Sequence, residues 1–212
     1  MPELKPVFSL PDARDVILEA ALAAFADHGF HGATMRDIAA RAQVSQSLVQ
    51  YHFKGKEALW NMVGERISAD FLEYVAAEIA PDASPAESMG RAARRYMAYW
   101  REHPAAFRFN LWRLLEGTPE ERGKRSKALN ERSVPLVQRA QAAGFIRNDM
   151  PAGLVLIILG ALVQFWLHSQ VEIGDALAVT GDALPDDETF IETILGLVSA
   201  QERATAKGAK GK

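Results

Sequence analysis

Residues 46–51 carry four hydrogen-bonding side chains that could contact the edges of DNA bases: Gln46, Ser47, Gln50 and Tyr51. At about 100° per residue along an α-helix, these side chains fall in one continuous arc, and Val49 and Phe53 fall on the opposite side. A glutamine amide can pair bidentately with adenine in the major groove, and the guanidinium of Arg36 can pair with guanine. The spacing therefore indicates a short helix with hydrogen-bonding groups facing outward and apolar anchors facing inward.

The signals for two short helices joined by a tight turn surround this arc. Thr34 can cap the first helix, and Asp37 three residues later completes a pair similar to a capping box. Residues 42–44 form the turn, and Ser45 can cap the second helix. A helix-turn-helix requires this arrangement to place its second helix in the major groove.

Residues 34–59 resemble the DNA-binding domain of the TetR family of transcriptional regulators. The pattern is T-x-R-x-I-A-x-x-A-x-V-S followed by Y-H-F-x-x-K-E-A-L, and the likeness extends from Ile17 to Leu59. The resemblance implies an all-helical homodimer. In such a protein three N-terminal helices bind operator DNA, and a larger helical domain binds a small effector and dimerises.

The resemblance also implies contacts with DNA at individual positions. Base contacts are implied for Arg36, Gln46 and Tyr51, and phosphate contacts for Thr34, His52 and Lys56. The chain departs from the family pattern at Gln43, Ser47 and Gln50, where the family often has glycine, a small residue and tyrosine. The predicted DNA-binding residues are Thr34, Arg36, Ser45, Gln46, Ser47, Gln50, Tyr51, His52 and Lys56.

The composition narrows the class of protein. The chain of 212 residues has no cysteine, which excludes disulfides, thiolate metal sites and cysteine nucleophiles. It contains no P-loop, glycine-rich dinucleotide turn, G-x-S-x-G or H-E-x-x-H motif, so we expect no enzyme, no cofactor and no metal site. The N-terminal segment lacks the basic stretch and apolar core of a secretory signal, and a cytoplasmic location is the simplest interpretation.

Charge is distributed unevenly along the chain, although the net charge is only −3. Residues 31–66 have a net excess of two positive charges, which coincides with the segment that would contact phosphates. Residues 84–147 carry thirteen basic and six acidic groups, and residues 148–200 carry eight acidic groups and no lysine or arginine.

We predict about nine helices and no strand, in four segments of the chain. These are a flexible arm at 1–11, a DNA-binding domain at 12–55, an effector-binding and dimerisation domain at 56–203, and a basic disordered tail at 204–212. A helix is expected from Lys56 to Pro81, where proline ends it. No linker interrupts this helix, so its motion could couple the two domains. Residues 171–186 contain two glycines, a proline and several acids, and we expect a loop there.

An aromatic concentration in the second domain suggests a pocket for an unidentified small-molecule effector, because apolar walls with a few polar groups suit a ligand. The same aromatic side chains would also suit a helical core. The predicted effector-binding residues are Tyr96, Trp100, His103, Phe107, Asn110, Gln164 and His168. A second basic cluster at Arg91, Arg94 and Arg95 would either contact an acidic effector or form a solvated face.

Residues 151–167 are the most apolar run, but they are too short to span a membrane and lack a basic flank. We expect a helix buried on nearly all sides. Together with a helix at 187–203 it would form a homodimer seam through segments near 151–169 and 187–203. The interpretation is a ligand-responsive transcriptional regulator, most simply a repressor, bound to a palindromic operator in double-stranded DNA. The alternatives are a helical ligand-binding or scaffolding dimer without operator function, and an all-helical enzyme.

Overall fold

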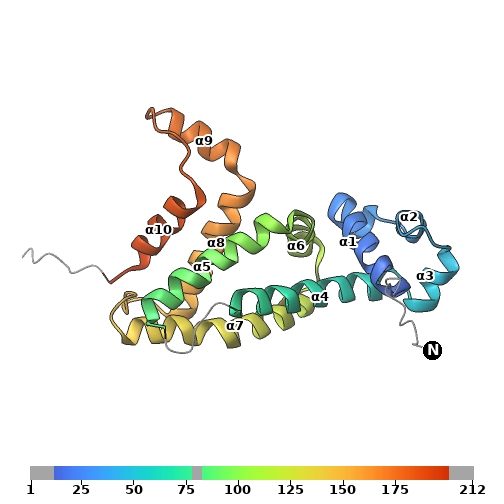
Figure 1. The fold of residues 1–212 in the computed structure, drawn as a ribbon, viewed down its shortest axis with the longest axis horizontal. Coiled ribbons are helices and arrows are strands. Elements are labelled where there is room, and N and C mark those ends of the chain that lie inside the picture. Colours follow the sequence, from blue (N-terminus) through green and yellow to red (C-terminus); the bar gives the residue numbers. More distant parts are fainter. Residues whose placement is uncertain (1–11, 78–82, 201–212) are drawn as a thin grey trace, which may run out of the picture. The chain divides into compact units, whose positions relative to one another are not determined.

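The computed structural model describes residues 12–77 and 83–200, and these residues form ten helices (Figure 1). The prediction of an all-α fold is confirmed, and one isolated bridge joins Ile146 and Ser199. The predicted arm at 1–11, the proline end of the fourth helix at Pro81 and the tail at 204–212 lie outside the described residues. The helices are α1 Ala13–Gly32, α2 Met35–Arg41, α3 Gln46–His52, α4 Lys56–Ala76, α5 Pro85–Glu102, α6 Pro104–Glu116, α7 Pro119–Ala142, α8 Ala152–His168, α9 Gln170–Ala178 and α10 Asp187–Val198.

The described residues divide into two compact units. The first contains the residues up to Asp70 together with His103–Gly123, and the second contains Phe71–Glu102 together with the residues from Lys124 onward. We expected the boundary near residue 55, but most of α4 and all of α6 belong to the first unit. The chain therefore crosses between the units three times, and two of these crossings lie inside α4 and α7.

Aromatic packing explains why α4 and α6 join the first unit. Phe25 of α1 is fully buried, and its ring centroid lies 5.0 Å from that of Trp60 and 6.1 Å from that of Phe109. The rings of Trp60 and Phe109 are 4.4 Å apart. Such ring pairs contribute roughly 0.5–1.5 kcal/mol beyond the area that they bury, so α1, α4 and α6 share one core.

Arg113 of α6 is a buried cation inside this unit. Its Nη1 donates to the carbonyl of Gly64 at 3.1 Å, and its Nε donates to Glu121 at 2.8 Å. A Cβ atom at Gly64 would lie 2.6 Å from the Arg113 Cζ atom. Glycine at this position therefore allows α4 and α6 to approach closely enough for the guanidinium to be satisfied.

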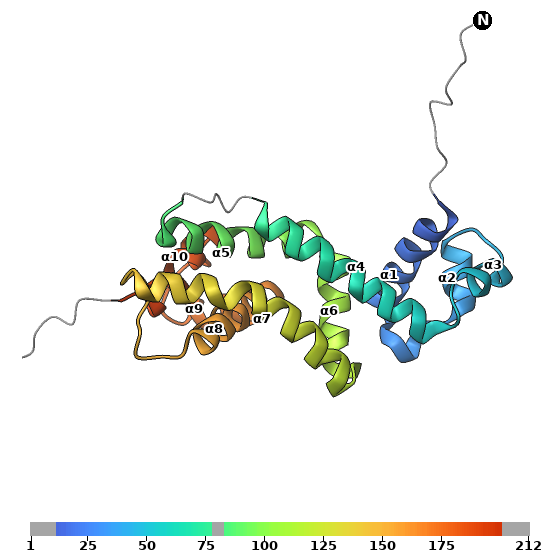
Figure 2. The same cartoon turned by 90° about the horizontal axis from the view of Figure 1, so that it is seen from below.

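The second unit is built from α5, α7, α8 and α10 around one apolar core (Figure 2). On α8 the buried face carries Val155, Leu159, Val163 and Trp166. The opposite face is not buried within the chain, since Leu154 is 48%, Ile157 56% and Phe165 51% exposed. The expectation of a helix buried on nearly all sides is therefore wrong for the single chain.

Helix α9 occupies the segment that we predicted as a loop. It follows α8 after a bend of 87° and has no buried residue. The glycine inside it, Gly174, costs only about 1 kcal/mol relative to alanine, so glycine content alone was a poor indicator of a loop. No single helix in the described ranges is long and apolar enough to cross a bilayer, and α8 and α9 meet the length and composition test only as a bent pair.

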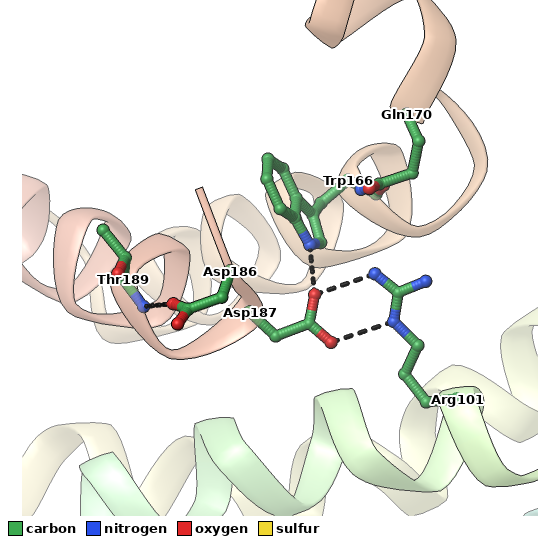
Figure 3. A network of polar contacts seen from close by, with 6 residues as sticks. All are labelled: Arg101, Trp166, Gln170, Asp186, Asp187 and Thr189. Carbon is green, nitrogen blue, oxygen red and sulfur yellow. Dashed lines mark hydrogen bonds and ion pairs between the residues drawn. The ribbon is translucent and has the colours of Figure 1, made fainter. Parts of the chain in front are cut away.

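A polar network joins α5, α8 and α10 (Figure 3). The Asp187 carboxylate accepts bonds from Arg101 Nε at 2.9 Å, Arg101 Nη2 at 2.8 Å and Trp166 Nε1 at 2.7 Å. Asp186 caps α10 by accepting from the Thr189 N–H at 2.8 Å. The hydrogen bonds from Arg101 hold the pKa of the Asp187 carboxyl below its ordinary value.

We predict that Asp187→Asn destabilises the chain by about 1 kcal/mol at neutral pH, because the bidentate ion pair is lost at a partly exposed site. The pKa of Asp187 is lowered in the folded state, so its contribution is present above the unfolded pKa of about 3.9 and is lost as the pH falls through the lower folded pKa. Urea denaturation from pH 7 to pH 3 should show the difference between the two proteins shrinking below about pH 4. The matched change Asp175→Asn, on the exposed face of α9, should have little effect. An Asp187→Asn protein as stable as the parent at pH 7 would contradict this role.

Candidate DNA-binding interface and effector cavity

The two caps predicted for the helix-turn-helix are confirmed. Thr34 Oγ1 accepts from the Asp37 N–H at 3.1 Å and donates to the Asp37 carboxylate at 2.6 Å. Ser45 Oγ accepts from the Leu48 N–H at 3.2 Å. Each bond satisfies a backbone donor that the first turn of a helix leaves free, so α2 and α3 begin at these residues.

The turn between α2 and α3 is a Schellman motif. The Val44 N–H bonds to the Ala39 carbonyl at 3.0 Å, and the Gln43 N–H bonds to the Ala40 carbonyl at 3.2 Å. Gln43 has a φ of 56°, in the left-handed region that favours glycine. This is the position at which the chain departs from the glycine of the family pattern.

Helix α3 presents the predicted polar arc to solvent. Val49 and Phe53 are buried at 0% and 2% exposure, and the hydrogen-bonding side chains on the opposite side are exposed. Tyr51 is 83% exposed, which is unusual for a large aromatic residue. The arc consists of Gln46, Ser47, Gln50 and Tyr51, with Ser45 exposed at its start.

The remaining predicted DNA-binding residues lie beside α3 and differ in their exposure and in the contacts that they make. Thr34 and Arg36 are exposed, and His52 is half-buried with its ring edge-on to Tyr51 at 5.2 Å. Lys56 Nζ donates to the Ala33 carbonyl at 3.1 Å and lies 4.6 Å from the Phe30 ring centroid. The ammonium is therefore held next to Thr34, at the start of α2.

Asp27 links three helices of the first unit, a role that we did not predict. Its carboxylate accepts from Arg41 of α2 at 2.9 Å and from Arg108 of α6 at 2.6 Å. The hydrogen bond from Arg41 is the main cause that lowers the pKa of Asp27. Because these residues are 14 and 81 positions from Asp27, no local pattern could have identified the link.

A cavity of about 410 Å³ lies within the second unit, between the end of α4 and helices α5, α7 and α8. Its walls are mostly aliphatic, with Phe71 and Tyr96 as the aromatic lining residues. Its polar side chains are Tyr96, Asn130, Arg132, Ser133 and Arg139, and four of these five belong to α7. Size and composition suit a small apolar ligand.

Tyr96 is the one predicted effector-binding residue that lines this cavity. Gln164 lies behind it and donates to the Tyr96 hydroxyl at 2.8 Å. Trp100 is buried and stacks on Phe71 at 5.3 Å, so it supports the wall instead of lining it. His168 is exposed, and its Nδ1 atom lies 2.7 Å from the Ser169 hydroxyl.

The other three residues of that prediction belong to the first unit and do not line this cavity. They are His103, Phe107 and Asn110. Phe107 is 8% exposed and belongs to α6, whose aromatic side chains pack with α1 and α4. Helical spacing showed that α6 has an apolar face but could not show which helices cover it. In the basic cluster of α5, Arg94 pairs with Glu188 and Arg95 donates to the Tyr74 carbonyl at 3.1 Å.

Family models match both parts of this arrangement. Residues 17–63 match "Bacterial regulatory proteins, tetR family", and residues 89–189 match "Tetracyclin repressor-like, C-terminal domain". The chain is 30% identical over 185 residues to the HTH-type transcriptional regulator RutR of Escherichia coli strain K12, covering 85% of this chain and 84% of that protein. It is 30% identical over 172 residues to the HTH-type transcriptional repressor SCO4008 of Streptomyces coelicolor, covering 80% and 85%.

A solved structure shows the same fold. The ketosteroid transcriptional regulator KstR2 of Mycobacterium tuberculosis matches with a TM-score of 0.67 at 18% identity, covering 91% of this chain and 98% of that one. The chain belongs to the TetR family of helix-turn-helix transcriptional regulators. Members of this family bind operator DNA and small-molecule effectors and act as dimers, and ligand-responsive repression is typical of them.

We predict that Gln43→Gly stabilises the chain by about 1 kcal/mol, because it removes the cost of a left-handed backbone at a residue with a Cβ atom. Urea denaturation followed by circular dichroism measures the change. The matched control Gln50→Gly replaces a glutamine inside α3, where glycine should destabilise by about 1 kcal/mol. A Gln43→Gly protein less stable than the parent would mean that this turn is not strained.

Proposed function

We propose that this chain is a homodimeric repressor that binds a palindromic operator through α3 and is released when an effector occupies the cavity of the second unit. The observation that carries the DNA-binding part is the exposed polar arc on α3, held by a buried apolar side and two capped helix starts. Gln46 and Gln50 offer bidentate amides for adenine, and Tyr51 offers a large exposed surface. Thr34, His52 and Lys56, which lie beside α3, would contact phosphates and so position the helix.

Helix α4 supports the release mechanism. Its first part contributes Leu59, Trp60 and Val63 to the buried residues of the first unit. Its last part contributes Phe71, Leu72 and Val75 to the cavity wall. An effector that prefers one position of this wall would shift the same helix at its other end. By linkage, that effector weakens operator binding by the factor by which operator weakens effector binding.

The exposed face of α8 supports the homodimer. Leu154, Ile157, Ala161 and Phe165 repeat every three or four residues along this face, and Leu197 is 61% exposed on α10. A second copy of the chain would cover both helices in a four-helix seam. Not every residue of these segments suits a test of the seam, because Ile194 is 2% exposed and lines the cavity of its own chain.

The first experiment selects duplex sites from random DNA with the purified protein. The enriched sites should be two-fold symmetric, because a dimer presents two copies of α3. Gln46→Ala should weaken binding to the selected site by about 1–3 kcal/mol and relax one base position in each half-site. The control Gln138→Ala, an exposed glutamine of α7, should change neither. If Gln46→Ala retained both the affinity and the base preference, α3 would not be the recognition helix as assigned.

For the dimer, we predict that Phe165→Arg yields a monomer or an aggregate, because an unpaired cation buried in the seam costs several kcal/mol. Light scattering at micromolar protein gives the mass. Leu115→Arg is the matched control, since Leu115 is 77% exposed on α6, and this variant should remain a dimer. A parent protein that is monomeric at this concentration, or a Phe165→Arg protein that stays a soluble dimer, would exclude α8 from the interface.

A further inference from the structure

The charged side chains that line the cavity are all of one sign. They are Arg132 and Arg139, both from α7, and no aspartate or glutamate is among the lining residues. The rest of the lining is aliphatic or aromatic apart from Asn130, Ser133 and the Tyr96 hydroxyl. An apolar cavity with two cations and no opposing carboxylate favours a ligand of matching chemistry.

The helical geometry of α7 places the two arginines together. They are seven residues apart, which is about two turns, so both lie on the same edge of the face that α7 turns to the cavity. Leu129, Ser133 and Leu136 occupy the middle of that face, and Asn130 lies on its other edge. A ligand group held at the arginine edge would therefore leave the rest of the molecule against apolar side chains.

Neither arginine is engaged elsewhere in the described part of the chain. Three other arginines of the second unit have carboxylate partners: Arg94 pairs with Glu188, Arg101 with Asp187 and Arg147 with Asp149. By contrast, the structure gives no ion pair or hydrogen bond among residues 12–77 and 83–200 for Arg132 or Arg139. Glu131, the acid nearest in sequence, is paired with Lys127 at 3.8 Å.

The position of Arg139 has a second physical explanation, which does not extend to Arg132. Arg139 lies in the last turn of α7, where a cation interacts favourably with the helix dipole. Arg132 is two turns earlier, beyond the range of that effect. Both arginines are also exposed, so in the free protein water solvates their guanidinium groups, which leaves them available to a ligand in the cavity.

We propose that the cavity binds an amphipathic molecule with an apolar body and a single carboxylate, which Arg132 and Arg139 hold at the edge of α7. The guanidinium groups form charge-assisted hydrogen bonds with the carboxylate, and the body lies against α4, α5 and α8. Ser133, in the middle of the same face, supplies a further donor. This inference rests on the proposed role of the cavity as the effector site.

The test measures binding to the free protein by calorimetry with three probes of equal chain length, each below its micellar concentration: decanoate, 1-decanol and decyltrimethylammonium. Decanoate should bind about tenfold more tightly than 1-decanol, and the cation should bind most weakly. Naphthalene-2-carboxylate and 2-naphthol repeat the comparison with an aromatic body. A carboxylate preference in either pair supports the proposal and tells an aliphatic from an aromatic effector.

Variants locate the binding site. The double variant Arg132→Gln/Arg139→Gln should remove the carboxylate preference and leave the affinity for the neutral probe unchanged. The matched control Lys124→Gln/Lys127→Gln removes the same charge from the same helix, at residues that do not line the cavity, and should retain the preference. Gly160→Leu should abolish binding of both probes. The Cβ atom that it adds lies 3.9 Å from the Tyr96 hydroxyl, and the rest of the side chain would occupy space between α8 and Tyr96 that the body of either probe needs.

Three outcomes would overturn the inference. The first is that decanoate binds no more tightly than 1-decanol and naphthalene-2-carboxylate no more tightly than 2-naphthol. The second is that the cation binds more tightly than decanoate, and the third is that the carboxylate preference survives in the arginine variant. Operator binding is measured in parallel with the DNA selected above. If the parent protein showed no carboxylate preference but bound the operator normally, the ligand class alone would be overturned. A carboxylate that binds through the two arginines without changing operator affinity would support the ligand class and contradict the proposed release mechanism.

Discussion

Glu116 of α6 accepts a hydrogen bond from the backbone N–H of Phe30 at 2.6 Å, at the point where Gly29 interrupts α1. Gly29 has a φ of 68°, and a Cβ atom there would lie 2.9 Å from Glu116 Oε2 and 3.0 Å from the Trp112 ring. The Trp112 indole donates to the Ala26 carbonyl at 3.2 Å. Hydrogen bonds between backbone groups of α1 and the side chains of Glu116 and Trp112 therefore hold the end of α1 against α6, and a side chain at residue 29 would clash with both of them. Asp27 also connects Arg108 of α6 with Arg41 of α2, which links α2 to the same two helices.

The contact between α1 and α6 determines which helices remain to form the cavity of the second unit. With α6 committed to α1, the cavity is built from α5, α7, α8 and the end of α4. Helix α6 follows α5 in sequence but packs in the first unit, together with the helix-turn-helix. The aromatic side chains of α6 therefore belong to the core of the first unit, and those of α5 belong to the core of the second. Three covalent crossings join the two units, and α4 and α7 are continuous across two of them. In the proposed release mechanism, these continuous helices connect the cavity with the first unit.

Sequence patterns predicted the local structure well, because caps and turns depend on neighbouring residues. Thr34 and Ser45 cap the helices for which they were proposed. Long-range partners could not be predicted in this way. The aromatic concentration included Phe107, but the choice between a ligand cavity and a helical core depends on long-range contacts. The contact of Phe109 with Phe25, for example, spans more than eighty residues. Arg132 and Arg139 look like ordinary surface residues in the sequence, and only the packing of α7 places them at a cavity.

The central claim is that the exposed arc of α3 contacts DNA bases, and site-specific photo-cross-linking tests it most directly. Tyr51 would be replaced by p-benzoylphenylalanine, which retains an aromatic ring at a position that is 83% exposed. Leu115, exposed on α6, would carry the same group as the control. The account predicts cross-links from position 51 to bases in both half-sites of the selected duplex and none from position 115. Cross-links from position 115 with none from position 51 would contradict it.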